Sequence, residues 1–176
     1  MADIIIAGFG GQGVLVLGQM ITYAGMIENK AVSWFPSYGP EQRGGTCNCS
    51  VVVTEEEIGS PLVTVPTAAI VMNGPSFERF EPVVGSGGLL IYNSSLIQNQ
   101  SNRDDIRVIA VPANDVADEL GNARVANMVM LGAFIEATGL IKQESLQESL
   151  KQVLSERHHN LIPLNMQALE RGRAYQ

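Results

Sequence analysis

Charged side chains are scarce in this sequence. Asp, Glu, Lys and Arg make up 16% of its 176 residues, whereas hydrophobic residues make up 45%. A surface this poor in charge is expected of a domain that hides part of itself against a partner protein, and equally of a sheet that helices bury on both faces. The first explanation also predicts that the isolated chain can pair with itself as a homodimer.

Basic residues are the scarcer of the two charged kinds. There are 11 Lys and Arg against 18 Asp and Glu, so the formal net charge is −7. Proteins that bind nucleic acid carry basic patches that neutralise phosphates. The charge balance therefore argues against a nucleic-acid partner.

Long apolar runs are also missing. No run approaches the roughly 18 residues that a membrane-spanning helix needs. Residues 1–9 lack the basic stretch that opens a secretory signal peptide. We therefore expect a cytoplasmic protein that makes no contact with a membrane.

Cysteine and histidine, which often hold metals, number two each. Cys47 and Cys49 form a C-x-C pair, and we expect their side chains to point to opposite faces of a strand as buried, unpaired thiols. His158 and His159 are consecutive and diverge in direction, which indicates a basic helix end. The sequence therefore predicts no metal bound by this chain.

The usual catalytic motifs are absent as well. The sequence contains no G-x-S-x-G elbow, no H-E-x-x-H motif, and no lysine in a glycine loop of the kind a P-loop has. A nucleophile with a base, or a pair of acids, is not found either. We predict no catalytic residue, and we expect the isolated chain to lack a full active site.

The most informative stretch lies at the start of the chain. A short apolar run at residues 4–7 is followed by Gly8-Phe9-Gly10-Gly11-Gln12-Gly13, and an apolar helical pattern begins at Val14. This order predicts a strand, a tight loop and a helix. The glycines match the G-x-G-x-x-G spacing, which lets the N–H groups at a helix start approach an anion.

A dinucleotide site needs more than these glycines. It normally has an Asp or Glu about 20 residues further on, at the end of the second strand, to hold the ribose hydroxyls. Here the apolar run 31–35 is followed by Pro36, Ser37 and Tyr38, and Glu28 lies before it. A free-standing dinucleotide-binding domain is therefore the less favoured alternative.

A second unusual segment spans residues 35–46. It contains two prolines and three glycines, so we expect neither a helix nor a regular strand. It leaves the second strand at the carboxyl edge of the sheet, where the first glycine loop also lies, and ligands bind at that edge in open parallel sheets. We interpret it as a functional loop rather than a plain connection.

The remaining pattern alternates between strands and helices. We expect strands at 47–54, 68–73, 89–92 and 106–111, and helices at 12–28, 77–83, 124–138, 143–157 and 165–173, with Ser76 as an N-cap. This order predicts a single α/β domain over residues 1–176, with a Rossmann-like, mostly parallel sheet and helices on both faces.

The helix expected at 124–138 is apolar on nearly all sides, so it must be enclosed. Asn127 is its polar exception. A buried asparagine usually bonds to backbone groups, but a ligand contact is the alternative, and the sequence leaves both open.

Taken together, the motifs resemble those of one family. The run 8–13, then Ser37-Tyr38-Gly39-Pro40-Glu41-Gln42-Arg43-Gly44-Gly45-Thr46 with Asn48-Cys49-Ser50-Val51, and later Arg124-Val125-Ala126-Asn127-Met128, resemble the gamma subunit of 2-oxoacid:ferredoxin oxidoreductases. The family acts on pyruvate, 2-oxoglutarate or ketoisovalerate. The resemblance covers essentially the whole chain.

The resemblance implies a subunit of a larger enzyme of anaerobic metabolism. The complex would convert a 2-oxoacid, coenzyme A and oxidised ferredoxin to an acyl-coenzyme A, carbon dioxide and reduced ferredoxin. Thiamine diphosphate and the iron–sulfur clusters would belong to alpha, beta and ferredoxin-like subunits. A short separate gamma chain most resembles the 2-oxoglutarate type, with the branched-chain and pyruvate types next.

The resemblance also implies a role for this chain in the coenzyme A site. Backbone N–H groups of the glycine loop could face its phosphates, and Arg43 could add a charge-assisted contact, unless Glu41 pairs with Arg43 to hold the loop. Tyr38 offers an aromatic face to a ligand or a subunit. The candidate contacts are Gly10, Gly11, Gln12, Gly13, Tyr38, Arg43, Gly44, Gly45 and Asn127. A pure assembly subunit without a ligand is the remaining alternative.

Overall fold

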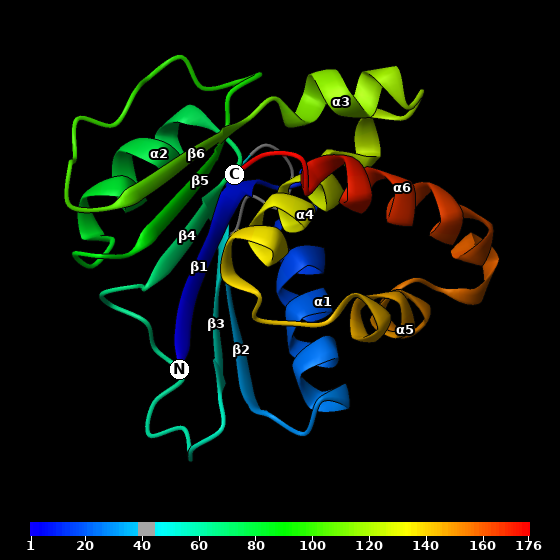
Figure 1. The fold of residues 1–176 in the computed structure, drawn as a ribbon, viewed down its shortest axis with the longest axis horizontal. Helices are drawn as coiled ribbons and strands as arrows, with labels where there is room; N and C mark the ends of the chain where they lie inside the picture. Colours follow the sequence, from blue (N-terminus) through cyan, green and yellow to red (C-terminus); the bar gives the residue numbers. More distant parts are fainter. Residues whose placement is uncertain (39–44) are drawn as a thin grey trace.

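The computed structural model describes residues 1–38 and 45–176. Within these residues, six strands form one sheet in the order β2-β3-β1-β4-β5-β6 (Figure 1). Their bounds are β1 Ala2–Phe9, β2 Ala31–Tyr38, β3 Thr46–Thr54, β4 Ala68–Val71, β5 Leu89–Asn93 and β6 Arg107–Val111.

Most of these strands run in the same direction. β1, β4, β5 and β6 pair in parallel, whereas β3 pairs antiparallel with both β1 and β2. β2 therefore runs in the direction of β1, with β3 between them. The predicted mostly parallel α/β sheet is confirmed, and among the described strands β3 is the exception.

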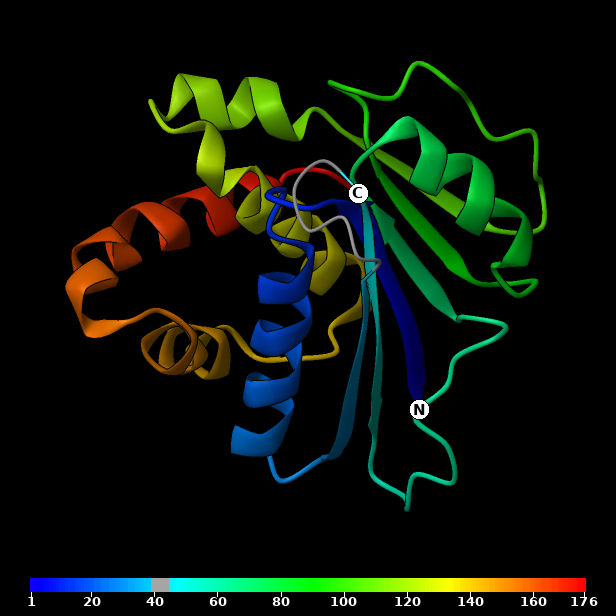
Figure 2. The same ribbon diagram turned by 180° about the vertical axis from the view of Figure 1, so that it is seen from behind.

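The helices lie on both faces of the sheet. Figures 1 and 2 show α1 (Val14–Ile27), α4 (Ala126–Thr138), α5 (Gln143–Val153) and α6 (Ile162–Gly172) on one side, and α2 (Gly74–Phe80) on the other. α3 (Ala113–Glu119) follows β6. Short 3₁₀ turns occupy Glu81–Val83, Ala123–Val125 and Glu156–Leu161.

Several predicted boundaries are corrected. Residues 36–38 belong to β2, because Pro36 is tolerated on an edge strand where no ladder N–H is needed. The N-cap of α2 is Asn73 and not Ser76: the Asn73 side chain accepts a hydrogen bond from the Ser76 N–H at 2.9 Å. α5 ends at Val153, and the two histidines lie in the 3₁₀ turn that follows.

The expectation for the two cysteines is half right. Cys47 and Cys49 are both buried free thiols, but both contribute to the same hydrophobic cluster, on the α1 side of the sheet. The predicted opposite orientation is wrong, because residues two apart in a strand point to the same face.

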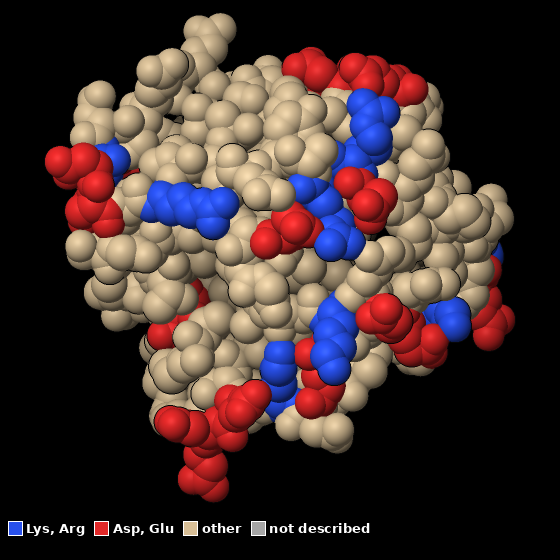
Figure 3. Space-filling model, viewed as in Figure 1, with Lys and Arg blue, Asp and Glu red and all other residues tan. Residues whose placement is uncertain are grey.

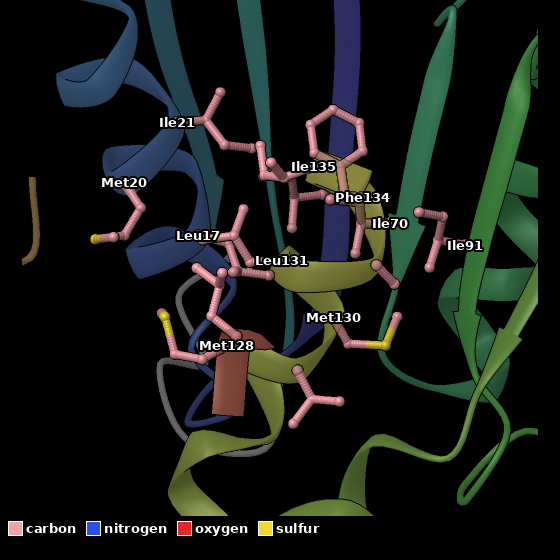
Figure 4. Close-up of a cluster of buried hydrophobic side chains, with 14 of the residues drawn as sticks. Leu17, Met20, Ile21, Ile70, Ile91, Met128, Met130, Leu131, Phe134 and Ile135 are labelled. Atoms are coloured by element: carbon pink, nitrogen blue, oxygen red, sulfur yellow. The ribbon is translucent and has the colours of Figure 1, made fainter. Parts of the chain in front are cut away.

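The α4 helix is enclosed, as its sequence predicts. Every residue from Ala126 to Ile135 is buried. Figure 4 shows Met128, Met130, Leu131, Phe134 and Ile135 among buried side chains of α1, β4 and β5. This helix therefore lies between the sheet and α6.

Helices do not cover the whole sheet. On the face away from α1, α2 packs against β1 and β4, while β2 and β3 present Ser33, Phe35, Ser37, Asn48 and Ser50 at least partly exposed. Phe35 is 44% exposed. Neither strand contains a charged residue.

Candidate functional site

The loop between β1 and α1 is held in a conformation that needs glycine. Gly11 has φ 100° and Gly13 has φ 77°, which lie in the left-handed region that side chains with a Cβ rarely adopt. Gly8 is needed for space instead: a Cβ there would lie 2.7 Å from Gln12 Oε1 and 2.9 Å from Met72 Cβ.

The two glycine-containing segments meet at one edge of the sheet, as predicted. Gly8 and Tyr38 both pair in register with Cys47, and the Gly10 N–H donates to the Gly45 carbonyl at 3.1 Å. The antiparallel β3 strand makes this possible, because it begins where β1 and β2 end. Gly10, Gly11, Gly13 and Gly45 therefore lie close together at this edge.

No residue in the described part of the chain caps the start of α1. Its N-cap, Gly13, has no side chain to cap the helix, and the first turn contains no acidic residue. The N–H groups of Val14, Leu15 and Val16 have no hydrogen-bond partner within the described residues. Such N–H groups carry the positive end of the helix dipole, so this turn can bind an anion.

A cavity of about 730 Å³ opens beside this turn. None of the described residues that line it is charged, and most of their side chains are apolar. They are Phe9, Gly10, Gly11, Gly13, Val14, Leu15, Val16, Trp34, Pro36, Thr46 and Cys47. Within this lining, polar contacts to a ligand come chiefly from the backbone.

Gln12 faces away from the cavity. Its Oε1 accepts hydrogen bonds from the Phe9 N–H at 2.7 Å and from Asn73 Nδ2 at 3.2 Å, and its Nε2 donates to the Met72 carbonyl at 3.3 Å. The side chain therefore joins the glycine loop to the end of β4 and to the start of α2.

Asn127 also bonds inside the chain. Its Nδ2 donates to the Gly13 carbonyl at 3.4 Å, and its Oδ1 accepts from the Met128 N–H at 2.9 Å. The residue is 6% exposed. A Cβ on Gly13 would overlap its amide, with Asn127 Cγ at 2.8 Å. Asn127 therefore bonds to a backbone group, which is one of the two alternatives that the sequence leaves open. Its side chain supports the glycine loop through the Gly13 carbonyl.

Of the other candidate contact residues, four glycines lie together and two residues fall outside the described part of the chain. Gly10, Gly11, Gly13 and Gly45 come together at the cavity or its edge. Tyr38 ends β2, while Arg43 and Gly44 lie outside the described residues, together with the suggested Glu41–Arg43 pair.

Trp34, Cys47 and Asn73 belong to this region but were not predicted. Trp34 packs against α1 where Gly18 leaves room, since a Cβ there would lie 2.7 Å from both Trp34 Nε1 and Cys49 Sγ. The indole N–H has no hydrogen-bond partner among the described residues. It points to the core rather than into the cavity. The alternation of β2 and the glycine at position 18 are the signals that could have indicated this contact.

The two thiols differ in setting. Cys47 lines the cavity, and burial raises its pKa. Cys49 lies deeper, and burial raises its pKa to about 12 despite the nearby Trp34 N–H. Both are therefore held as neutral thiols near pH 7.

The wider surface agrees with a site that depends on backbone groups. Figure 3 shows Lys and Arg side chains interspersed with Asp and Glu on one face of the molecule. In residues 1–38 and 45–176, no group of three or more His, Cys, Asp or Glu gathers to hold a metal. No helix in the described part of the chain is long and apolar enough to cross a bilayer.

Sequence comparison gives a family match over almost the whole chain. The family model described as pyruvate ferredoxin/flavodoxin oxidoreductase matches residues 3–175. The ketoisovalerate oxidoreductase subunit VorA of Methanothermobacter thermautotrophicus is 41% identical over 169 residues, which are 95% of this chain and 35% of that protein. The chain thus spans about a third of that relative.

A second kind of relative is similar over most of its own length. The 2-oxoglutarate synthase subunit KorC of the same organism is 36% identical over 163 residues, which cover 85% of this chain and 82% of that protein.

Solved structures share the fold. The gamma subunit of a keto/oxoacid ferredoxin oxidoreductase from Geobacter sulfurreducens has a TM-score of 0.82 at 24% identity, covering 98% of this chain and 96% of that one. The 2-oxoglutarate:ferredoxin oxidoreductase of Magnetococcus marinus, solved with 2-oxoglutarate, coenzyme A and succinyl-CoA bound, has a TM-score of 0.88 at 23% identity, covering 99% of this chain and 31% of that one.

Proposed function

Because the chain belongs to the pyruvate ferredoxin/flavodoxin oxidoreductase family, we propose that it works as the gamma subunit of a cytoplasmic, multi-subunit 2-oxoacid:ferredoxin oxidoreductase. The complex converts a 2-oxoacid, coenzyme A and oxidised ferredoxin to an acyl-coenzyme A, carbon dioxide and reduced ferredoxin. The isolated chain is inactive. Its partners are alpha, beta and ferredoxin-like subunits.

The redox cofactors belong to those partners in this proposal. Cys47 and Cys49 are both buried in the α1 face of the sheet, and no other cysteine is present. An iron–sulfur cluster normally takes four cysteine ligands, so this chain does not fit one. Thiamine diphosphate, which supplies the carbanion chemistry at the 2-oxoacid, is likewise assigned to the partner subunits.

The role of this chain is to form one wall of the coenzyme A site. The observation that carries this role is the start of α1, which no described residue caps and which opens on a cavity of about 730 Å³ whose described lining is uncharged. Phosphate oxygens accept hydrogen bonds from helix-start N–H groups, and apolar side chains suit the uncharged part of the ligand. Gly10, Gly11, Gly13 and Gly45 shape this wall, and Tyr38, Arg43 and Gly44 stay candidate contacts from the sequence alone.

Partner subunits cover the bare part of the sheet. β2 is an edge strand, and exposed edges are normally protected by charged side chains. Here both β2 and β3 lack charge, and Phe35 of β2 is exposed. In the isolated chain the same surface can support a homodimer.

Co-purification tests the assembly. The tagged full chain, recovered from the cell that makes it, should retain alpha-type, beta-type and ferredoxin-like chains, and the recovered complex should reduce ferredoxin with a 2-oxoacid and coenzyme A. Phe35→Glu should reduce that recovery, while Leu96→Glu, an equally exposed change elsewhere, should not. Turnover by the isolated chain would contradict the proposal.

Ligand titration separates the proposal from its alternatives. Trp34 is the single tryptophan of the chain and lines the cavity, so the difference in fluorescence between the complex and the same complex with Trp34→Phe reports binding there. Coenzyme A should change the signal, whereas NAD and FAD should not. Response to NAD alone would favour a dinucleotide-binding domain, and no response to any of them would favour pure assembly.

The substrate follows from a direct assay. We propose 2-oxoglutarate as the first substrate to test. The 41% identity to a ketoisovalerate oxidoreductase subunit favours a branched-chain 2-oxoacid as the second. The ratio of kcat/KM for the two acids in the recovered complex decides between them.

A further inference from the structure

The amide of Gln12 has a distinct position in the glycine motif. All three of its hydrogen bonds are internal: two are accepted from Phe9 N–H and Asn73 Nδ2, and one is donated to the Met72 carbonyl. The residues around it, Gly10, Gly11 and Gly13, line the cavity, but Gln12 does not. It therefore serves the loop and not the ligand directly.

The first glycine of the motif makes room for this amide. A Cβ on Gly8 would lie 2.7 Å from Gln12 Oε1 and 2.9 Å from Val14 Cγ2. Only a residue without a side chain at position 8 leaves Gln12 able to turn back under the loop. Position 8 therefore requires glycine because of contacts within this chain and not because of a ligand.

Asn73 extends the connection to a second helix. Its Oδ1 accepts the Ser76 N–H and so caps α2, and its Nδ2 donates to Gln12 Oε1. Asn73 is 4% exposed, and the adjacent Met72 N–H donates to the Ala7 carbonyl at 2.8 Å. The loop after β1 is therefore bonded to the end of the neighbouring parallel strand and to the helix that follows it.

We propose that Gln12 and Asn73 are positioning residues, which hold the glycine loop so that the first N–H groups of α1 face the cavity in the geometry that a phosphate-bearing ligand requires. The inference rests on the proposed coenzyme A role. Loss of the amide leaves the loop glycines free to adopt other backbone angles, and the N–H groups then no longer converge on one acceptor.

The test uses the complex recovered with the full chain and compares three variants. Gln12→Ala removes all three bonds. Asn73→Ser removes the bond to Gln12 but keeps a hydroxyl that can cap α2. Gln147→Ala, a change of the same kind at an exposed position of α5, is the control.

Coenzyme A affinity and steady-state kinetics are then measured together. Gln12→Ala should raise the Kd, followed by Trp34 fluorescence, and the KM for coenzyme A by tenfold or more. Asn73→Ser should raise them about threefold, which is the order expected for one hydrogen bond. The kcat at saturating coenzyme A should stay within twofold, and the melting temperature of Asn73→Ser should match that of the wild type.

The outcomes distinguish a failure of the positioning role from a failure of the proposed coenzyme A role. If the wild-type complex binds coenzyme A and Gln12→Ala binds it equally well, the positioning role is wrong and the proposed function stands. If Gln12→Ala and Asn73→Ser lower the melting temperature and leave the KM unchanged, the amides are merely structural. If calorimetric titration shows that the wild-type complex binds no coenzyme A, both proposals fail.

Discussion

The α4–α6 crossing and the turn before α1 both depend on glycine, but for opposite reasons. At the crossing, Gly132 faces the Leu169 carbonyl and Gly172 faces the Val129 carbonyl, so closely that a Cβ at either site would overlap the backbone. At the turn, a Cβ added to Gly11 would meet no atom within 4 Å, and the φ of this residue is 100°. Protein backbone fills the space beside Gly132 and Gly172, whereas the cavity lies beside Gly11.

This difference separates a structural glycine from a candidate binding glycine. Where backbone occupies the space of the missing Cβ, the glycine lets two elements approach and contributes to stability. Where the space is open and the backbone is left-handed, the glycine shapes a surface. Substitutions at the two places should therefore affect stability and ligand binding to different extents.

Gly132→Ala should have the largest effect. The added methyl group would lie on the Leu169 carbonyl oxygen, 2.9 Å from its carbon and 3.1 Å from the Arg173 nitrogen, so α6 must move away from α4. We expect a loss of about 3 kcal/mol or more in the free energy of unfolding, measured by chemical denaturation.

Gly59→Ala is the control for this comparison, because nothing lies within 4 Å of its added Cβ. It should change stability by less than about 0.5 kcal/mol. Equal losses at positions 59 and 132 would show that the crossing is not tightly packed.

Gly13→Ala should come second. It combines a positive φ with an overlap of the Asn127 amide, so we expect a loss of about 2 kcal/mol. Because the obstacle is a side chain, the double variant Gly13→Ala/Asn127→Ala should lose less than the sum of the two single changes. Strict additivity in denaturation experiments would mean that Asn127 does not support the loop.

Gly11→Ala should destabilise less and affect binding more. Its Cβ meets no atom within 4 Å, so the cost is the strain of φ 100° alone, about 1 kcal/mol. The loop can relieve this strain by changing shape, which should weaken coenzyme A binding in the complex. A variant that loses stability as Gly132→Ala does, with unchanged coenzyme A affinity, would remove the distinction between the two places.

The local parts of this site could be read from the sequence, and the long-range parts could not. The strand, glycine loop and start of α1 follow one another within residues 4–14, where composition and periodicity determine the structure. The shared edge was also predictable, because β1 and β2 run in the same direction. The bond from Asn127 to Gly13 joins residues 114 positions apart, and no local pattern specifies such a contact.

The wrong orientation predicted for the cysteines and the internal hydrogen bonds of Gln12, which were not predicted, have different origins. Cys47 and Cys49 were placed on opposite faces although a strand repeats every two residues. Gln12 was grouped with the ligand contacts because it lies inside the glycine motif. Its side-chain partners Met72 and Asn73 lie between β4 and α2, and only the fold brings them near the loop.

Thiol labelling sharpens the distinction between cavity and core. Cys47 lines the cavity, whereas Cys49 lies deeper, with a pKa raised to about 12. At pH 8 iodoacetamide should modify Cys47 slowly and leave Cys49 intact, because alkylation requires the thiolate and access. Desulfo-coenzyme A, which has no thiol for iodoacetamide to consume, should slow the reaction at Cys47 in the complex. Faster labelling at Cys49 than at Cys47, measured by peptide mass spectrometry, would contradict this description of the cavity.

The end of α1 should show the smallest effect, because the backbone N–H groups of Glu28, Asn29 and Lys30 bond to its last carbonyls, whereas no described residue caps its start. Burial tends to raise the pKa of Glu28, but its carboxylate accepts the Lys142 N–H at 2.7 Å and pairs with Lys30 Nζ at 2.9 Å, so the net pKa is lowered. A lowered folded-state pKa means that this stabilisation is complete above the unfolded pKa of about 4.3 and is lost as the pH falls through the folded value.

Glu28→Gln should therefore cost about 0.5 kcal/mol at pH 7, since solvent screens the pair. The difference from wild type should shrink below pH 4, as denaturation curves at several pH values can establish. The same change should leave coenzyme A affinity unaltered, because Glu28 lies at the end of α1 remote from the cavity. A loss of affinity in this variant would mean that the two ends of α1 are coupled, and the contrast between a closed structural end and an open binding end would no longer hold.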